Sequence, residues 1–102
     1  IERTLLSVDQ PSTQPPRYDL VSVYPNPFNP ITNIEYNLRT FSEFELDLYD
    51  LLGRQIQNLD HGMKPPGKYS MRFDGAHLAS GVYVVVLRTR MSFTTSRIVI
   101  AK

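Results

Sequence analysis

The chain has 102 residues, a formal net charge of +1, 41% apolar and 21% charged residues, and no cysteine. This size predicts one packed domain, and the near-neutral charge without a long basic run argues against nucleic acid or an anionic membrane as partner. The lack of cysteine excludes disulfides and thiolate metal sites, and no apolar run approaches the roughly 20 residues that cross a bilayer.

The first segment of the chain is predicted to be a linker. Residues 8–19, VDQPSTQPPRYD, are rich in Pro, Ser, Thr and Gln, so they bury little apolar surface and are typical of a semi-rigid spacer. Residues 1–8, IERTLLSV, are too short to fold alone and are interpreted as the tail of an upstream domain. Because the chain starts with Ile and shows no leader, we expect a piece of a longer protein, with linker and tail over 1–17 and one domain over 18–102.

The next segment, YPNPFNP at residues 24–30, places Pro25, Pro27 and Pro30 within six residues. Each proline fixes its own φ and biases the preceding residue away from the helical region, so the segment has few conformations to lose on folding. Because proline donates no ladder hydrogen bond, we expect an edge or corner, with Phe28 inserted into the core. We expect the prolines chiefly to build the fold at the linker boundary.

Short strand-like segments then follow, separated by turn residues. Residues 43–50 alternate apolar side chains at 44, 46 and 48 with acidic ones at 43, 45 and 47, which is typical of a half-buried strand. Residues 33–38 and 68–74 alternate in the same way, and residues 20–24 and 54–59 are shorter strand-like segments.

The last two segments complete the predicted sheet. Residues 81–91, GVYVVVLRTRM, are apolar on both faces, which predicts a central strand covered on at least part of its second face. Residues 92–102, SFTTSRIVIAK, give a final strand, and no window shows helical periodicity over the ~10 residues that a helix needs. The expected fold is all-β, an immunoglobulin-like antiparallel β-sandwich of about seven strands.

The sequence offers no constellation typical of catalysis or metal binding. The two histidines, His61 and His77, each fall in a turn-like segment without metal-ligand spacing, and no G-x-S-x-G motif accompanies the serines, His77 and Asp74. The calcium-loop ladder is missing from DLYDLLGR, where Asp50 is expected to accept backbone hydrogen bonds and Gly53 to take a positive φ. We expect no catalytic residue, no cofactor and no metal.

Carbohydrate binding has weak support, since the chain has no tryptophan. Tyr36, Tyr69 and Tyr83 are assigned to the apolar sides of their strands, and Tyr49 lies on a polar face. The polar faces differ in sign, acidic over residues 43–47 and basic elsewhere, so cross-strand charge pairing and a recognition surface both stay open. The basic residues are Lys68, Arg72, Arg88 and Arg90.

Four separated motifs occur in order: YPNPFNP at 24–30, YDLLGR at 49–54, LASGVY at 78–83 and a final RIVIAK at 97–102. From about residue 18 to residue 102 the chain resembles the type A C-terminal sorting domain of the type IX secretion system. The resemblance implies an immunoglobulin-like, non-catalytic address at the end of cargo proteins such as hydrolases and adhesins. The chain departs from the family pattern at Ile31, where Thr or Ser is usual, and in RTRMSFTTS, which lacks a glycine often found in the final hairpin turn.

The resemblance also implies a route and partners. Cargo enters the periplasm of a Gram-negative bacterium by its own signal, the translocon recognises the domain, and in many cases a sortase-like protease removes it and attaches the cargo to the cell surface. The linker before Tyr18 is the expected place of removal, because it is predicted to be exposed and poor in structure. The family uses the region matching residues 96–102 for translocon recognition. The residues expected to form the motifs and carry recognition are Tyr24, Pro25, Asn26, Pro27, Phe28, Asn29, Pro30, Asp50, Gly53, Arg54, Ser80, Gly81, Val82, Tyr83, Arg97, Ile98, Val99, Ile100 and Lys102.

Two other functions stay open at this point. Immunoglobulin-like domains of flagellar hook-cap proteins share the strand pattern and parts of the YDLLGR and SGVY motifs, but the YPNPFNP opening argues against them. The second alternative is a cell-attachment or carbohydrate-binding module that is retained on the mature protein.

Overall fold

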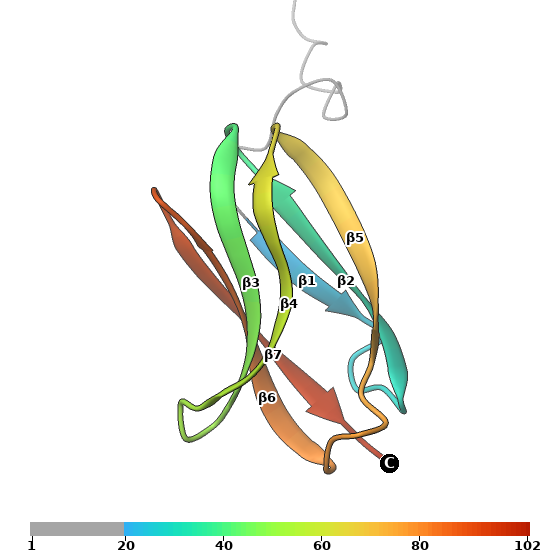
Figure 1. Ribbon diagram of the computed structural model, residues 1–102. Coiled ribbons are helices and arrows are strands. Elements are labelled where there is room, and N and C mark those ends of the chain that lie inside the picture. The colour runs from blue at the N-terminus through green and yellow to red at the C-terminus, as the bar shows by residue number, and fades with distance from the viewer. Residues whose placement is uncertain (1–19) are drawn as a thin grey trace, which may run out of the picture.

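A computed structural model describes residues 20–102 of the chain (Figure 1). The predicted linker and upstream tail over residues 1–17 lie outside the described residues. Within residues 20–102 the chain forms seven strands and no helix. The strands are β1 (Leu20–Tyr24), β2 (Ile31–Leu38), β3 (Ser42–Asp50), β4 (Gln55–Lys64), β5 (Gly67–Asp74), β6 (Gly81–Thr89) and β7 (Phe93–Ile100).

The strands form two antiparallel sheets, ordered β1-β2-β5 and β4-β3-β6-β7. The pairs β1–β2, β3–β4 and β6–β7 are hairpins, whereas β2–β5 and β3–β6 join strands that are not consecutive in the chain. Strand β6 lies in the interior of its sheet, as its apolar composition predicts. The expected all-β, immunoglobulin-like sandwich is confirmed.

The core lies between the two sheets and follows the alternation of the sequence. In β3, Phe44, Leu46 and Leu48 are at most 1% exposed. A one-residue slip of register would turn these side chains to the other face, so core packing fixes the register of the strand. The other fully buried apolar residues of the core come from three more strands, β2, β6 and β7: Ile34, Tyr36, Leu38, Val85, Leu87, Ile98 and Ile100.

Two polar residues of the four-stranded sheet differ from the sequence-based picture. The prediction that His61 lies in a turn is wrong, because β4 continues to Lys64 and His61 pairs with Glu45 of β3. Asp47 lies on the polar face as predicted, yet it is only 1% exposed. Its Oδ1 accepts hydrogen bonds from Gln55 Nε2 at 3.2 Å and Asn58 Nδ2 at 2.7 Å, which replace water around the buried carboxylate.

The sandwich has two ends that differ in content. Strand β1 begins at one end, together with the connections at residues 39–41, 65–66 and 90–92, and we call this end the linker pole. The connections at residues 25–30, 51–54 and 75–80 lie at the other end with residues 101–102, at the bottom of Figure 1, and we call it the motif pole. The prolines therefore do not lie at the linker boundary, because β1 carries the chain to the opposite pole first.

Candidate recognition site at the motif pole

The proline segment, residues 25–30, runs along the edge of β7, which is the outermost strand of its sheet. Asn26 donates from Nδ2 to the Arg97 carbonyl at 2.9 Å, and its Oδ1 accepts from the Val99 N–H at 2.9 Å. Phe28 donates its N–H to the Val99 carbonyl at 3.0 Å, and its carbonyl accepts from the Ala101 N–H at 3.0 Å. One side-chain amide and one residue of main chain thus continue the ladder where the prolines donate nothing.

The Phe28 side chain points away from this edge and into the core, where it is 3% exposed. Its ring meets Phe73 edge-on, with the ring centroids 6.1 Å apart. Gly75 makes room for it, because a Cβ there would lie 3.4 Å from a Phe28 ring carbon and 3.1 Å from Ile100 Cδ1. The predicted insertion of Phe28 is confirmed, and Gly75 is a contributor that its sequence context did not reveal.

The proline segment is also held from the sheet β1-β2-β5. Thr32 donates from Oγ1 to the Pro25 carbonyl at 2.7 Å, and Gly75 donates its N–H to the Pro30 carbonyl at 2.8 Å. The peptide bonds before all three prolines of the motif are cis. The bonds from Thr32 and Gly75 hold the main chain of the motif, and its outward residues are exposed to solvent. These exposed residues are Tyr24, Pro25, Asn26, Pro27 and Asn29.

The turn between β3 and β4 is built on the Asp50 carboxylate. Its Oδ1 accepts from the Leu52 and Arg54 N–H groups at 2.9 Å each, and its Oδ2 accepts from Arg54 Nε at 2.8 Å. These bonds, that from the Arg54 N–H above all, hold the pKa of Asp50 below its ordinary value. Gly53 has a φ of 84°. The predicted roles of Asp50 and Gly53 are confirmed, and the turn presents Leu51 and Leu52 at 66% and 79% exposure.

The loop between β5 and β6 holds Lys102. Lys102 donates from Nζ to the carbonyls of Ala76, at 2.8 Å, and of Leu78, while its N–H donates to Ser80 Oγ at 3.2 Å. Tyr83 donates from its hydroxyl to the Ala79 carbonyl at 2.8 Å. The LASGVY motif and the final lysine, which are about 20 residues apart in the sequence, thus form one hydrogen-bonded unit.

The structure gathers the sequence-predicted recognition residues at one pole and divides them between interior and surface. Ile98 and Ile100 are core residues, and Tyr83 is partly buried against the core. Arg97 is exposed, and Val99 is half-buried on the outer face of the sheet. The side chains that face solvent, rather than the whole signature, are the ones that a partner can contact.

The described residues hold no group of three or more His, Cys, Asp or Glu side chains that could bind a metal ion. The ring nitrogens of the two histidines lie near amide oxygens, His61 Nδ1 at 2.9 Å from Asn58 Oδ1 and His77 Nε2 at 3.1 Å from Gln57 Oε1. No helix in this part of the chain is long and apolar enough to span a bilayer.

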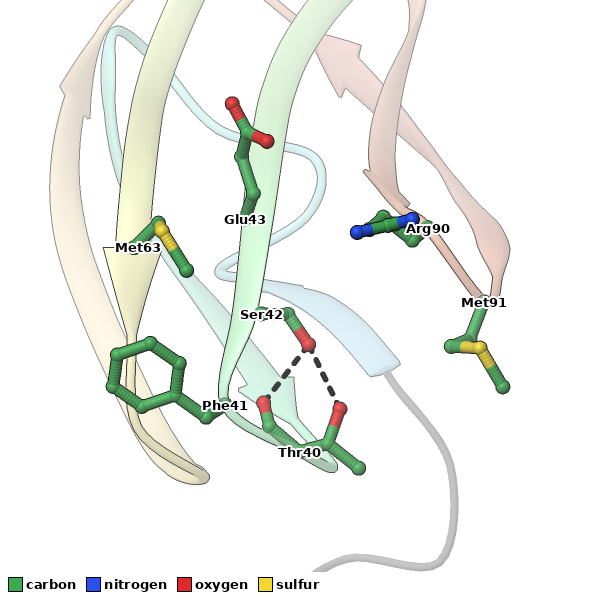
Figure 2. A pocket seen from close by; sticks show the side chains of 7 residues that line it. All are labelled: Thr40, Phe41, Ser42, Glu43, Met63, Arg90 and Met91. Carbon is green, nitrogen blue, oxygen red and sulfur yellow. Dashed lines mark hydrogen bonds between the residues drawn. The ribbon is translucent and has the colours of Figure 1, made fainter.

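A cavity of about 510 Å³ lies at the linker pole, away from the motifs (Figure 2). Ser42 Oγ lies 2.9 Å from Thr40 Oγ1 and donates to the Thr40 carbonyl, so the two hydroxyls are held by each other. Glu43 is the one acid in the lining, and its carboxylate makes no hydrogen bond to either hydroxyl, so nothing in the described wall activates them as nucleophiles. Its lining residues are Thr40, Phe41, Ser42, Glu43, Met63, Arg90 and Met91.

A charged cluster closes the sandwich between β2 and β4. Lys64 Nζ lies 4.8 Å from the Tyr69 ring centroid and 5.6 Å from that of Tyr36, and donates to Asp60 Oδ2 at 3.2 Å. Burial alone would raise the pKa of Asp60, but hydrogen bonds from Tyr36, the His61 N–H and Lys64 lower it. The hydrogen bond with Tyr36 raises the pKa of Lys64. The cluster is part of the packing and lies apart from the motif pole.

A family model described as secretion system C-terminal sorting domain matches residues 22–101 of this chain. Comparison with curated proteins and with solved structures finds no significant match.

Proposed function

The chain belongs to the family of secretion system C-terminal sorting domains, and on that premise we propose that it directs an attached cargo across the outer membrane through recognition of its motif pole. Membership supports a sorting role in type IX secretion, and such a role implies a cargo protein, the secretion machinery, and export to the cell surface or beyond. The family is generally non-catalytic.

The observation that carries the proposal is the pair of hydrogen bonds at Asn26, one donated to the Arg97 carbonyl and one accepted from the Val99 N–H. They join the proline motif to the segment over residues 96–102, so that the two ends of the signature form one surface. We propose that the translocon contacts the solvent-facing residues of this pole, and that Phe28, Ile98 and Ile100 act by holding the surface in shape.

The cargo belongs at the other end of the molecule. Because β1 starts at the linker pole, a domain joined through residues 1–17 would leave the motif pole open to the translocon. We propose that the sorting domain extends over residues 18–102, and that a sortase-like protease cleaves within the preceding linker before surface attachment. The linker lies outside the described residues, and its composition supports this part of the proposal.

The sorting function is tested by gain of export. A periplasmic reporter carrying residues 1–102 should appear outside cells that have type IX secretion, whereas the same reporter ending at residue 95 should stay in the periplasm. Measurement is by immunoblot of periplasm, cell surface and medium. Equal export of the shortened reporter, or retention of both, would contradict the proposal; a translocon-deficient strain is the matched control.

A further inference from the structure

The outer face of the sheet β4-β3-β6-β7 changes in character along its length. Near the linker pole, the Arg88 side chain lies across this outer face. Its NH2 group donates a hydrogen bond to Tyr49 Oη at 3.2 Å, and its NH1 group lies 3.6 Å from Glu45 Oε1 and 3.8 Å from Asp47 Oδ2. Its guanidinium carbon is 5.7 Å from the Phe93 ring centroid. The charged neighbours thus form a lid made of the sheet's own side chains.

The effect of this lid is visible in the exposure of β6. Val86, which pairs with Asp47 and precedes Arg88 by two residues, is 5% exposed although it points away from the core. One row further toward the motif pole lies Val84, and beyond it is Val82, both on the same outer face because the intervening Val85 is fully buried. Val84 and Val82 are only half-buried.

The uncovered half of the face forms a strip of valines. Val82 pairs with Val99 of β7, and Val84 lies between Tyr49 of β3 and Arg97 of β7. We call Val82, Val84 and Val99 the valine strip. The predicted cover over part of the second face of this strand is present at Val86, where the side chains around Arg88 supply it. The opposite sheet packs on the other side, so it does not cover Val82 and Val84. A solvated sheet face normally carries polar residues, so an uncovered strip of this kind marks an interaction surface.

The charges beside the strip indicate the chemistry of its partner. Arg97 is exposed, flanks Val84, and makes no ion pair with any of residues 20–102. The side chain of Arg54, in the turn that presents Leu51 and Leu52, is 73% exposed, and its link to Asp50 uses Nε. An apolar surface with carboxylates at its rim would match this arrangement of valines, leucines and cations.

We infer that the valine strip docks on a protein of the secretion machinery whose contact surface is apolar and rimmed by carboxylates. The inference rests on the proposed sorting function and names the contact through which it works. A second copy that packed strip to strip about a two-fold axis would bring its own Arg54 and Arg97 to the same interface. Binding to an anionic membrane would be favoured by only about 1 kcal/mol for each of these two arginines. The chain also lacks tryptophan, which is typical of interfacial anchors, so a protein partner is favoured over a membrane.

The test uses the reporter joined to residues 1–102 and compares paired substitutions on one face of one sheet. Val84→Lys places a charge in the strip, and Arg97→Glu reverses the flanking charge while leaving its main-chain bond to Asn26. Thr95→Glu is the matched control, since Thr95 is exposed on the same face of β7 two residues away. We expect Val84→Lys and Arg97→Glu each to lower export about tenfold, which corresponds to a loss of roughly 1.4 kcal/mol of binding free energy, and Thr95→Glu to leave export unchanged.

Thermal unfolding of each purified domain separates lost contact from lost fold. Arg97→Glu alters an exposed side chain and keeps the test valid if Val84→Lys unfolds. Normal export of a folded Arg97→Glu variant, or an equal loss with Thr95→Glu, would overturn the inference while the unmodified reporter is still exported. Failure of the unmodified reporter would instead overturn the sorting function. Two further results would reassign the strip: a dimer of the isolated domain that Val84→Lys dissociates, or sedimentation with anionic vesicles that Arg97→Glu abolishes.

Discussion

Phe28 and Asn26 are close neighbours in one motif and stabilise different parts of the molecule. The ring of Phe28 fills the core next to Phe73 and Gly75, while Asn26 is exposed and bonds to the main chain of β7. Asn26 therefore stabilises the edge of a sheet, and Phe28 stabilises the core between the two sheets.

Phe28→Ala should destabilise the domain strongly, because it removes a ring that is 3% exposed and leaves a cavity beside Phe73. The expected loss in the free energy of unfolding is about 3 kcal/mol or more, measured by urea denaturation. Phe41→Ala is the control, since Phe41 is 62% exposed and its loss should cost less than about 0.5 kcal/mol. A Phe28→Ala domain of unchanged stability that fails in export would instead assign the ring to recognition.

Asp50 should make the stability of the domain depend on pH in acid. Its pKa is lower in the folded chain than its ordinary value of 3.8, so the ionised form stabilises the fold above that pH. This stability should be lost as the pH falls from about 3.8 through the lower folded pKa.

The variant Asp50→Asn isolates this effect. It should melt at a lower temperature than the unmodified domain near pH 6, and the gap between the two melting temperatures should narrow as the pH falls below 3.8. Melting curves from pH 6 to pH 2 check this. A gap that stays constant over the whole range would show that the carboxylate charge does not contribute to the turn.

At the scale of elements, β7 is an edge strand whose outer hydrogen-bonding groups are occupied at one end. Edge strands offer free main-chain groups on which other chains can pair, and proteins cover or interrupt them. Here the cover comes from a segment that cannot pair as a strand of its own, because three of its residues are prolines. Edge protection and the proline motif are the same structural feature.

Asn26→Ala should therefore loosen one end of β7. It removes two hydrogen bonds and should cost about 1–2 kcal/mol in the free energy of unfolding. Hydrogen exchange should show faster exchange of the Val99 amide in particular, because that N–H loses its acceptor. Asn29→Ala provides the control within the same motif, since Asn29 is exposed and no described side chain bonds to it. Equal protection of the Val99 amide from exchange in both variants would show that the Asn26 side chain does not hold this end of β7.

How far the sequence predicts the molecule depends on the distance over which residues interact. Alternation in β3 and the double-sided apolar composition of β6 follow from nearest neighbours, and both strands lie where the pattern predicts. The length of β4 does not follow from nearest neighbours. Gly62 and the prolines after it are typical of a turn, but in the structure Gly62 pairs with Phe44 in the sheet. Tertiary pairing outweighs local propensity there.

The candidate site at the scale of the whole molecule could be predicted only in part. The bonding of Asp50 in its own turn is local, and the sequence predicts it. The bonds from Asn26 to β7 span 71 and 73 residues, and the burial of Asp47 depends on side chains of β4. Such contacts depend on the order of strands in the sheets, which periodicity does not specify. The arrangement of all four motifs at one pole is a property of that topology.

The long sequence separation between Asn26 and its partners in β7 also determines when folding of the domain can be completed. During synthesis the chain emerges from its N-terminal end, so everything before Leu20 and most of the sandwich exists before Arg97 and Val99 are available to Asn26. A protein cut short by premature termination or proteolysis before Val99 would lack the edge that the proline motif covers. A completely folded domain would therefore occur only in polypeptides whose preceding residues have all been synthesised.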